Sequence, residues 1–223
     1  MSETGMESRP LVRQLPDPAT APNVRYDPSL EELRELAAPD ETTTEFGSPS
    51  YVSEFRSRSA DRTKNAVDDE FTDRDHALID EAVDSTDDIE LLCVDRLMGR
   101  HPEASFCCRL FVPVEHARIA YAWAKLFEPS DGRDPDLYTV QLPDHDETAI
   151  RVLPDTGFTA VLGSDYTGEA KKSFLRLFMY RIKQQAVSGS TRVASASASA
   201  TLTATSGPSA RSSWDCPRPA NPR

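Results

Sequence analysis

Short apolar runs of strand length are the feature that most constrains the fold of this chain. Turn-forming or charged residues bound each run, and amphipathic segments of helical period lie between and after the runs. Strands that alternate with such helices pack as a sheet covered by helices, so the pattern predicts an α/β fold. The predicted strands occupy residues 89–95, 106–112, 137–142, 149–153 and 158–162.

Two amphipathic helices are predicted in the second half of the chain. One spans residues 114–127, with Pro113 at its first helical position, and another spans residues 168–184. A helix buries one stripe of its surface against a sheet, so the apolar stripes are candidate core residues. These stripes consist of Ile119, Trp123 and Phe127 in the first helix, and of Phe174, Phe178 and Ile182 in the second.

Two capping signals predict helices in the first half. Ser29, followed three residues later by Glu32, has the pattern of a capping box and predicts a helix through about Ala38. Thr72, followed by Asp75, predicts a second helix start. The predicted core-facing side of this second helix carries His76, Ile79 and Val83.

Three stretches lack both the strand and the helix period. Residues 1–28 are rich in proline and polar side chains, which predicts an extended arm. Residues 39–71 and 128–136 are polar and rich in turn-forming residues, so they are predicted to be irregular.

The formal net charge of -12 argues against nucleic acid as a partner, because phosphate backbones bind positive surfaces. Arginine replaces lysine almost throughout, and aspartate outnumbers glutamate. Such a surface favours a source that lives in strong salt, such as a halophilic archaeon, because high salt screens the self-repulsion of the charge. The alternative is plain acidic drift.

The cysteines and the N-terminal residues indicate the compartment. None of the four cysteines forms a C-x-x-C pair, which argues against a zinc site, and adjacent Cys107 and Cys108 are expected to alternate between the two faces of a strand. The N-terminus carries early acids and no apolar core, so it does not have the pattern of a signal peptide. No stretch approaches the length of a membrane span. A reduced, cytoplasmic protein that does not associate with membranes is expected.

The segment from Gly163 to Phe174 is the candidate site for chemistry. It lies where a predicted strand ends and a helix begins, which is where open α/β sheets bind ligands and helix N-termini attract anions. Lys171 and Lys172 fall in the first helical turn, where the helix dipole disfavours cations. Residues that break a local rule are candidates for function, the alternative being that these lysines are simply solvated.

The residues Tyr166, Gly168, Glu169, Lys171 and Lys172 resemble the Y-x-G-E-x-K-K motif of the ATP-dependent phosphoenolpyruvate carboxykinases. Further likenesses lie upstream, and together they cover about residues 45–185. The stretches 92–95 and 108–112 resemble that family's strand pair ahead of its first long helix. Arg58-Ser59 with Asp61-Arg62 resembles its substrate loop, although Ser57 stands where the family has glycine.

The resemblance implies a carboxy-lyase of gluconeogenesis that converts oxaloacetate and ATP into phosphoenolpyruvate, carbon dioxide and ADP. It implies that residues 29–185 form the family's N-terminal, substrate-binding domain, with a mixed sheet and flanking helices. It also implies that Arg58 and Tyr166 bind oxaloacetate, and that Lys172 is a catalytic residue and a ligand of Mn²⁺ or Mg²⁺, with Lys171 a bystander. A lysine ligates a metal only when it is neutral.

Three parts of the family site are missing from the sequence as written: a histidine ligand, an aspartate ligand and the nucleotide-binding loop. No G-x-x-x-x-G-K-[ST] pattern occurs. The chain alone is therefore expected to lack turnover. The alternative function is a non-catalytic acidic α/β binding domain with a low-complexity tail. Proximity of Arg58 to Lys172 in a strand–turn–helix would favour the enzyme family, and a large separation would favour the alternative.

The composition changes after Gln185. Residues 186–223 contain no Lys and no Glu and are dominated by Ala, Ser, Thr and Pro, which predicts a disordered tail. A chain truncated or frameshifted after Gln185 explains this change. If each tail codon begins one base late, Trp214, Asp215 and Cys216 force an original Gly-Leu pair, and the following residues permit Ser-Ala-Thr-Gly-Lys-Ser, a nucleotide-binding loop. The alternative is a natural low-complexity tail.

Overall fold

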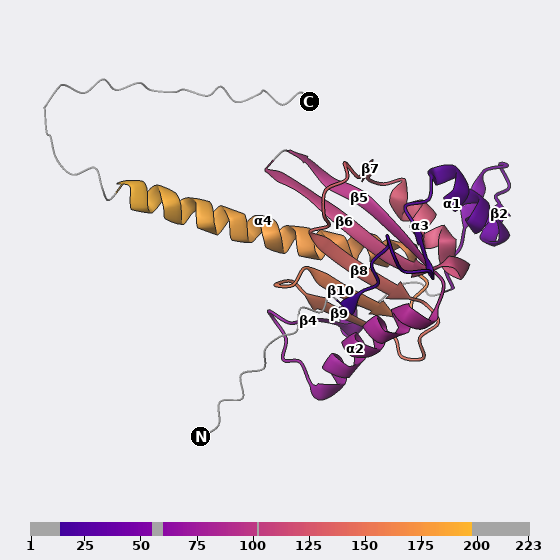
Figure 1. The fold of residues 1–223 in the computed structure, drawn as a ribbon, viewed down its shortest axis with the longest axis horizontal. Helices are drawn as coiled ribbons and strands as arrows, with labels where there is room; N and C mark the ends of the chain where they lie inside the picture. Colours follow the sequence, from indigo (N-terminus) through magenta and orange to yellow (C-terminus); the bar gives the residue numbers. More distant parts are fainter. Residues whose placement is uncertain (1–13, 55–59, 102, 198–223) are drawn as a thin grey trace, which may run out of the picture. The chain divides into compact units, whose positions relative to one another are not determined.

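The computed structural model describes residues 14–54, 60–101 and 103–197 and has the expected α/β architecture (Figure 1). The chain divides into two units, Met1–Gln185 and Ala186–Arg223, and the first unit holds the sheet. Within the described ranges, no helix is long and apolar enough to cross a membrane.

An eight-stranded mixed sheet organises the first unit. The strand order is β1-β5-β6-β8-β10-β9-β4, and β7 pairs with β5 beside this path. The pairs β1–β5, β6–β8, β8–β10 and β4–β9 are parallel, whereas β5–β6, β5–β7 and β9–β10 are antiparallel. The strands are β1 (Val24–Tyr26), β4 (Thr63–Asn65), β5 (Leu91–His101), β6 (Ala104–Pro113), β7 (Glu128–Pro129), β8 (Leu137–Leu142), β9 (Ala149–Leu153) and β10 (Phe158–Leu162).

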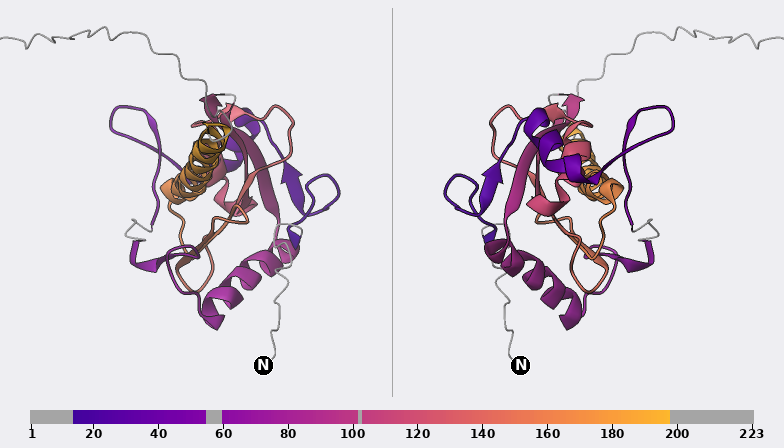
Figure 2. Two further views of the ribbon diagram at one scale, coloured as in Figure 1. Left: turned by 90° about the vertical axis from the view of Figure 1, so that its left-hand side faces the viewer. Right: turned by 90° about the vertical axis from the view of Figure 1, so that its right-hand side faces the viewer.

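Helices cover both faces of this sheet, as the two side views show (Figure 2). On one face, α2 (Asp73–Asp88) packs Leu78, Ile79, Ala82 and Val83 against the strands. The other face is covered by α1 (Leu30–Ala37), α3 (Ala117–Ala124) and the first turns of α4 (Thr167–Ser197). In that layer the rings of Trp123 and Phe174 lie 5.0 Å apart.

Short elements complete the described part. A small separate hairpin consists of β2 (Glu41–Thr43) and β3 (Pro49–Tyr51). Three 3₁₀ turns, η2 (Ala38–Asp40), η3 (Ala60–Arg62) and η4 (Val114–His116), connect the larger elements.

The local signals predicted many elements correctly. Strands β8, β9 and β10 have the predicted bounds, and both capping boxes form, with Ser29 and Glu32 at α1 and with Thr72 and Asp75 at α2. Cys107 and Cys108 lie on β6, and both thiols are free. Burial raises the pKa of the Cys108 thiol well above its ordinary value, as expected for a core residue rather than a reactive one.

The prediction of the buried side of α2 was wrong at His76, which is exposed. Leu78 and Ala82 take its place in the core, because the buried side is rotated from the predicted stripe. The predicted helix 114–127 was too long. Pro113 ends β6, and the helix itself begins only at Ala117, after η4. Proline has no backbone N–H to donate within a sheet, but it is tolerated at the end of a strand. Pro113 therefore closes β6 and does not open the helix.

Two stretches predicted to be extended or irregular contribute strands to the main sheet. Residues 24–26 of the arm form β1 beside β5, and residues 63–65 form β4 beside β9. Both strands are only three residues long, and their pairing partners lie far away in the sequence, so no local period marks them.

The helix α4 continues to Ser197, beyond residue 186, where the tail was predicted to begin. Residues 186–197 contain no proline, the strongest helix breaker, and a helix that has already begun needs no new nucleus to continue. The remainder of the predicted tail, residues 198–223, lies outside the described residues.

Candidate functional site

The predicted strand–turn–helix forms at the carboxyl end of β10. The strand ends at Leu162, and α4 begins at Thr167. Gly163, between them, has φ +60°, and a Cβ at this position would lie 2.7 Å from the carbonyl oxygen of Glu147. A side chain would therefore meet both a strained backbone and a backbone clash, so glycine is required here.

The motif residues of the turn form one compact arrangement. The Lys172 ammonium lies 5.0 Å from the centroid of the Tyr166 ring, within the range of a cation–π contact. A Cβ on Gly168 would lie 2.4 Å from an atom of that ring. Gly168 therefore leaves the space that lets Tyr166 lie across the start of α4.

Glu169 holds the basic side chains of this turn. Its side chain is fully buried, and its two oxygens accept from Lys172 at 2.7 Å and from Arg176 at 3.0 Å. The side chain of Lys172 remains 35% exposed, whereas Lys171 is fully on the exposed side of the helix. The structure thus separates the two lysines: one is directed by a buried carboxylate and an aromatic ring, and the other faces solvent.

Sequence reasoning missed the residues that anchor the turn from outside. The Gln141 side-chain amide, at the end of β8, donates to the backbone oxygens of Ser164 at 2.9 Å and Tyr166 at 3.2 Å. Arg118, on α3, donates to both the carboxylate and the backbone oxygen of Asp165. These contacts join positions more than twenty residues apart, so no local pattern could reveal them.

Arg58, the predicted carboxylate ligand, lies outside the described residues. The separation of Arg58 and Lys172, which would discriminate the two functional hypotheses, is therefore untested.

The described residues do not by themselves fit a manganese or magnesium ion. Across the ranges that the structure describes, no group of three or more His, Cys, Asp or Glu side chains could hold a metal ion. The Lys172 nitrogen lies 2.7 Å from a Glu169 oxygen, so in this geometry it is engaged by a carboxylate.

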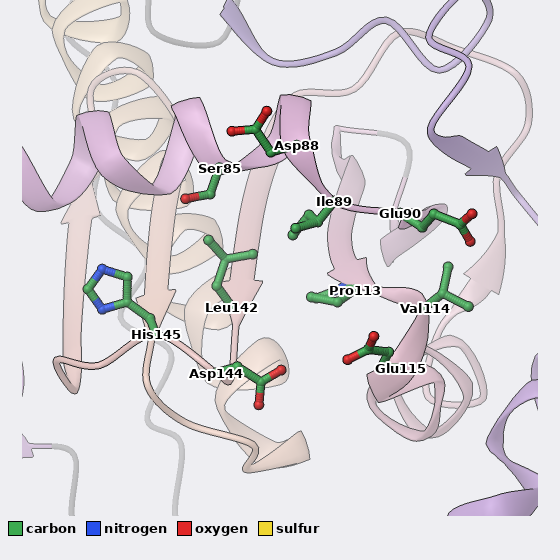
Figure 3. A pocket seen from close by; sticks show the side chains of 10 residues that line it. All are labelled: Ser85, Asp88, Ile89, Glu90, Pro113, Val114, Glu115, Leu142, Asp144 and His145. Atoms are coloured by element: carbon green, nitrogen blue, oxygen red, sulfur yellow. The ribbon is translucent and has the colours of Figure 1, made fainter.

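A hollow of about 530 Å³ opens at the same edge of the sheet, between the end of α2 and the ends of β6 and β8 (Figure 3). Its apolar floor includes Ile89, Pro113 and Leu142. Four carboxylates surround this floor, which makes the hollow unsuited to a dianion such as oxaloacetate. They belong to Asp88, Glu90, Glu115 and Asp144.

Comparison with known proteins gives one informative similarity. No family model matches the chain. The chain is 30% identical over 160 residues to the phosphoenolpyruvate carboxykinase (ATP) of Aeropyrum pernix, an alignment that covers 70% of the chain and 32% of that protein. The chain therefore spans about a third of the length of this relative.

Proposed function

We propose that this chain is the N-terminal, substrate-binding part of an ATP-dependent phosphoenolpyruvate carboxykinase. The family reaction converts oxaloacetate and ATP into phosphoenolpyruvate, carbon dioxide and ADP, as a cytoplasmic step of gluconeogenesis. The similarity to the Aeropyrum pernix protein supports this proposal. The observation that carries it is the placement of Lys172 between the buried Glu169 carboxylate and the Tyr166 ring at the end of β10.

The residues of this turn suit a small dicarboxylate. The dipole of α4 favours a negative charge at the N-terminus of this helix. Lys172 adds a positive charge that is partly exposed, and Tyr166 adds a phenol beside it. In the proposal, Lys172 and Tyr166 bind and orient oxaloacetate, and Arg58 binds one of its carboxylates.

The same proposal predicts that the chain alone does not turn over. Phosphoryl transfer depends on a cradle that positions the phosphates and neutralises their charge. The sequence contains no such loop, and the described residues hold no metal site. Oxaloacetate binding without formation of phosphoenolpyruvate is the expected behaviour.

Calorimetric titration with fresh oxaloacetate, and with oxalate as an analogue that does not decarboxylate, tests the proposal. Lys172→Met should weaken binding about tenfold or more, because it removes a charge that faces the ligand. Lys171→Met is the matched control, since it removes the same charge one residue away on the exposed side, and it should change the affinity by less than about twofold.

Two results would contradict the proposal. One is the absence of binding heat for both ligands, which would favour the non-catalytic acidic domain. The other is an equal loss in both lysine variants, which would indicate a general effect of net charge.

The nucleotide sequence after the Gln185 codon tests the origin of the tail. Restoring one base near that codon should open a long reading frame that encodes Gly-Lys-Ser opposite residues 220–222. An early stop codon in the restored frame would contradict the frameshift and support a natural low-complexity tail.

A further inference from the structure

We infer that Asp165 is a positioning residue, which fastens the chain segment around Ser53 and Glu54 to the turn that carries Tyr166. The inference rests on the proposed function, because it concerns the same oxaloacetate site. Asp165 itself does not contact the substrate in this proposal. It acts through Tyr166, its neighbour in the sequence.

Asp165 receives hydrogen bonds on both its side chain and its backbone. Its Oδ2 accepts from the Arg118 guanidinium at 2.7 Å and from the Glu54 backbone N–H at 2.7 Å. Its backbone oxygen accepts from Arg118 at 3.0 Å and from the Ser53 hydroxyl at 3.2 Å. Its side chain is only 12% exposed. One residue thus joins three separate parts of the chain.

Arg118 supports this junction and is not itself available to bind a substrate carboxylate. Its side chain is 7% exposed, and its guanidinium lies between Asp165 and Asp40, with Nε 3.1 Å from the Asp40 carboxylate. A guanidinium that already faces two carboxylates has its charge compensated and most of its donors committed. Its role is to hold Asp165 rather than to attract an anion.

The junction controls the backbone on both sides of Tyr166. The oxygen of Asp165 is fixed by Arg118 and Ser53, and the oxygen of Tyr166 is fixed by Gln141. With both peptide groups held, the Cα–Cβ direction of Tyr166 is set, and its ring lies against Gly168 and near the Lys172 ammonium.

The test compares Asp165→Asn with Asp40→Asn. Both variants remove one carboxylate charge from Arg118 while keeping the side-chain shape, but only Asp165 adjoins Tyr166 and Glu54. Two quantities are measured: the affinity for oxalate by calorimetry, and amide hydrogen exchange in peptides that cover residues 49–54 and 163–168. Thermal denaturation of each variant shows that it is folded.

Asp165→Asn should weaken oxalate binding about tenfold, the effect of losing one charge-assisted hydrogen bond network, and should speed exchange in both segments together. Asp40→Asn should change the affinity by less than about twofold and leave exchange in both segments near the original rate.

The inference is overturned if Asp40→Asn has the same effect as Asp165→Asn, or if Asp165→Asn speeds exchange in one segment only. The exchange measurement requires no ligand. If the unmodified chain binds no oxalate, the proposed function fails, while the exchange rates still decide whether Asp165 fastens the two segments.

Discussion

Two helices of this protein begin with a buried carboxylate that faces two basic side chains, but the partners come from different places. At α2, Asp75 accepts from Lys64 on β4 and from Arg151 on β9, both at 2.6 Å. At α4, Glu169 accepts from Lys172 and Arg176, which lie on α4 itself.

The difference separates a charge cluster that connects tertiary elements from one that lies at the proposed oxaloacetate site. The ion pairs of Asp75 connect a helix to two strands, so they stabilise tertiary structure. The ion pairs of Glu169 with Lys172 and Arg176 lie within one helix, yet this carboxylate is fully buried, and burying a charge is costly. What this arrangement achieves is the placement of Lys172 beside Tyr166.

The largest effect is expected from Asp75→Asn, which leaves Arg151 and Lys64 facing a neutral amide. Breaking a buried pair of this kind costs about 3–5 kcal/mol of the free energy of unfolding. Urea denaturation measures it. Asp73→Asn, at an exposed position of the same helical turn, should cost less than about 0.5 kcal/mol. A loss below about 1 kcal/mol for Asp75→Asn would contradict the claim that the ion pairs of Asp75 stabilise the tertiary structure.

The pH dependence of stability should come next in size. Burial alone would raise the pKa of Asp75, but hydrogen bonds from Lys64 and Thr72 and the charge of Arg151 outweigh it and hold the pKa well below its usual range. The folded-state pKa is depressed, so the stabilisation is fully present above the unfolded-state pKa of about 4 and is lost as the pH falls below that value.

Denaturation series in urea at descending pH values test this linkage. The unmodified chain should lose about 2–3 kcal/mol more than Asp75→Asn as the pH falls from neutral through the acid range. Parallel curves for the two proteins would show that Asp75 has no depressed pKa.

Glu169→Gln should cost less stability than Asp75→Asn, about 1–2 kcal/mol, because Lys172 and Arg176 are each about a third exposed and can turn towards water. The same variant should weaken oxalate binding, because Lys172 loses the group that directs it. Urea denaturation and calorimetry measure the two effects. Equal stability losses in Glu169→Gln and Asp75→Asn would contradict the claim that the Asp75 cluster contributes more to stability than the Glu169 cluster.

The smallest effect is expected at a third buried carboxylate, Asp95, whose partners again come from separate strands. Tyr26 on β1 donates to it at 2.8 Å, and Arg109 on β6 binds both its oxygens. Tyr26→Phe should cost about 1 kcal/mol, since Arg109 still compensates the charge.

An absorbance titration of the same tyrosine provides a second check. Burial, together with the hydrogen bond to Asp95, raises the pKa of Tyr26 to about 12. If every tyrosine titrated near 10, the described contact would not exist in solution.

Features with a local cause were predictable from the sequence, and features with a distant cause were not. The caps at Ser29 and Thr72 depend on residues three positions apart, and both were predicted. The turn at Gly163 was predicted because an apolar strand run ends there and a helical pattern begins a few residues later. Arg118 joins Asp165 across 47 positions, and Arg151 joins Asp75 across 76, so only the folded chain reveals them.

Mapping oxalate on the chain by backbone amide chemical shifts tests the central claim most directly, because it reports both helix starts in one experiment. The proposed function predicts that the largest saturable shift changes fall at Ser164–Glu169 and Lys172, with none above the noise at Thr72–Asp75. The changes should require at least about tenfold more oxalate in Lys172→Met and be retained at the original concentration in Lys171→Met. Shift changes centred on α2 or on the acidic hollow at Asp88 and Asp144, or no saturable change at all, would contradict it.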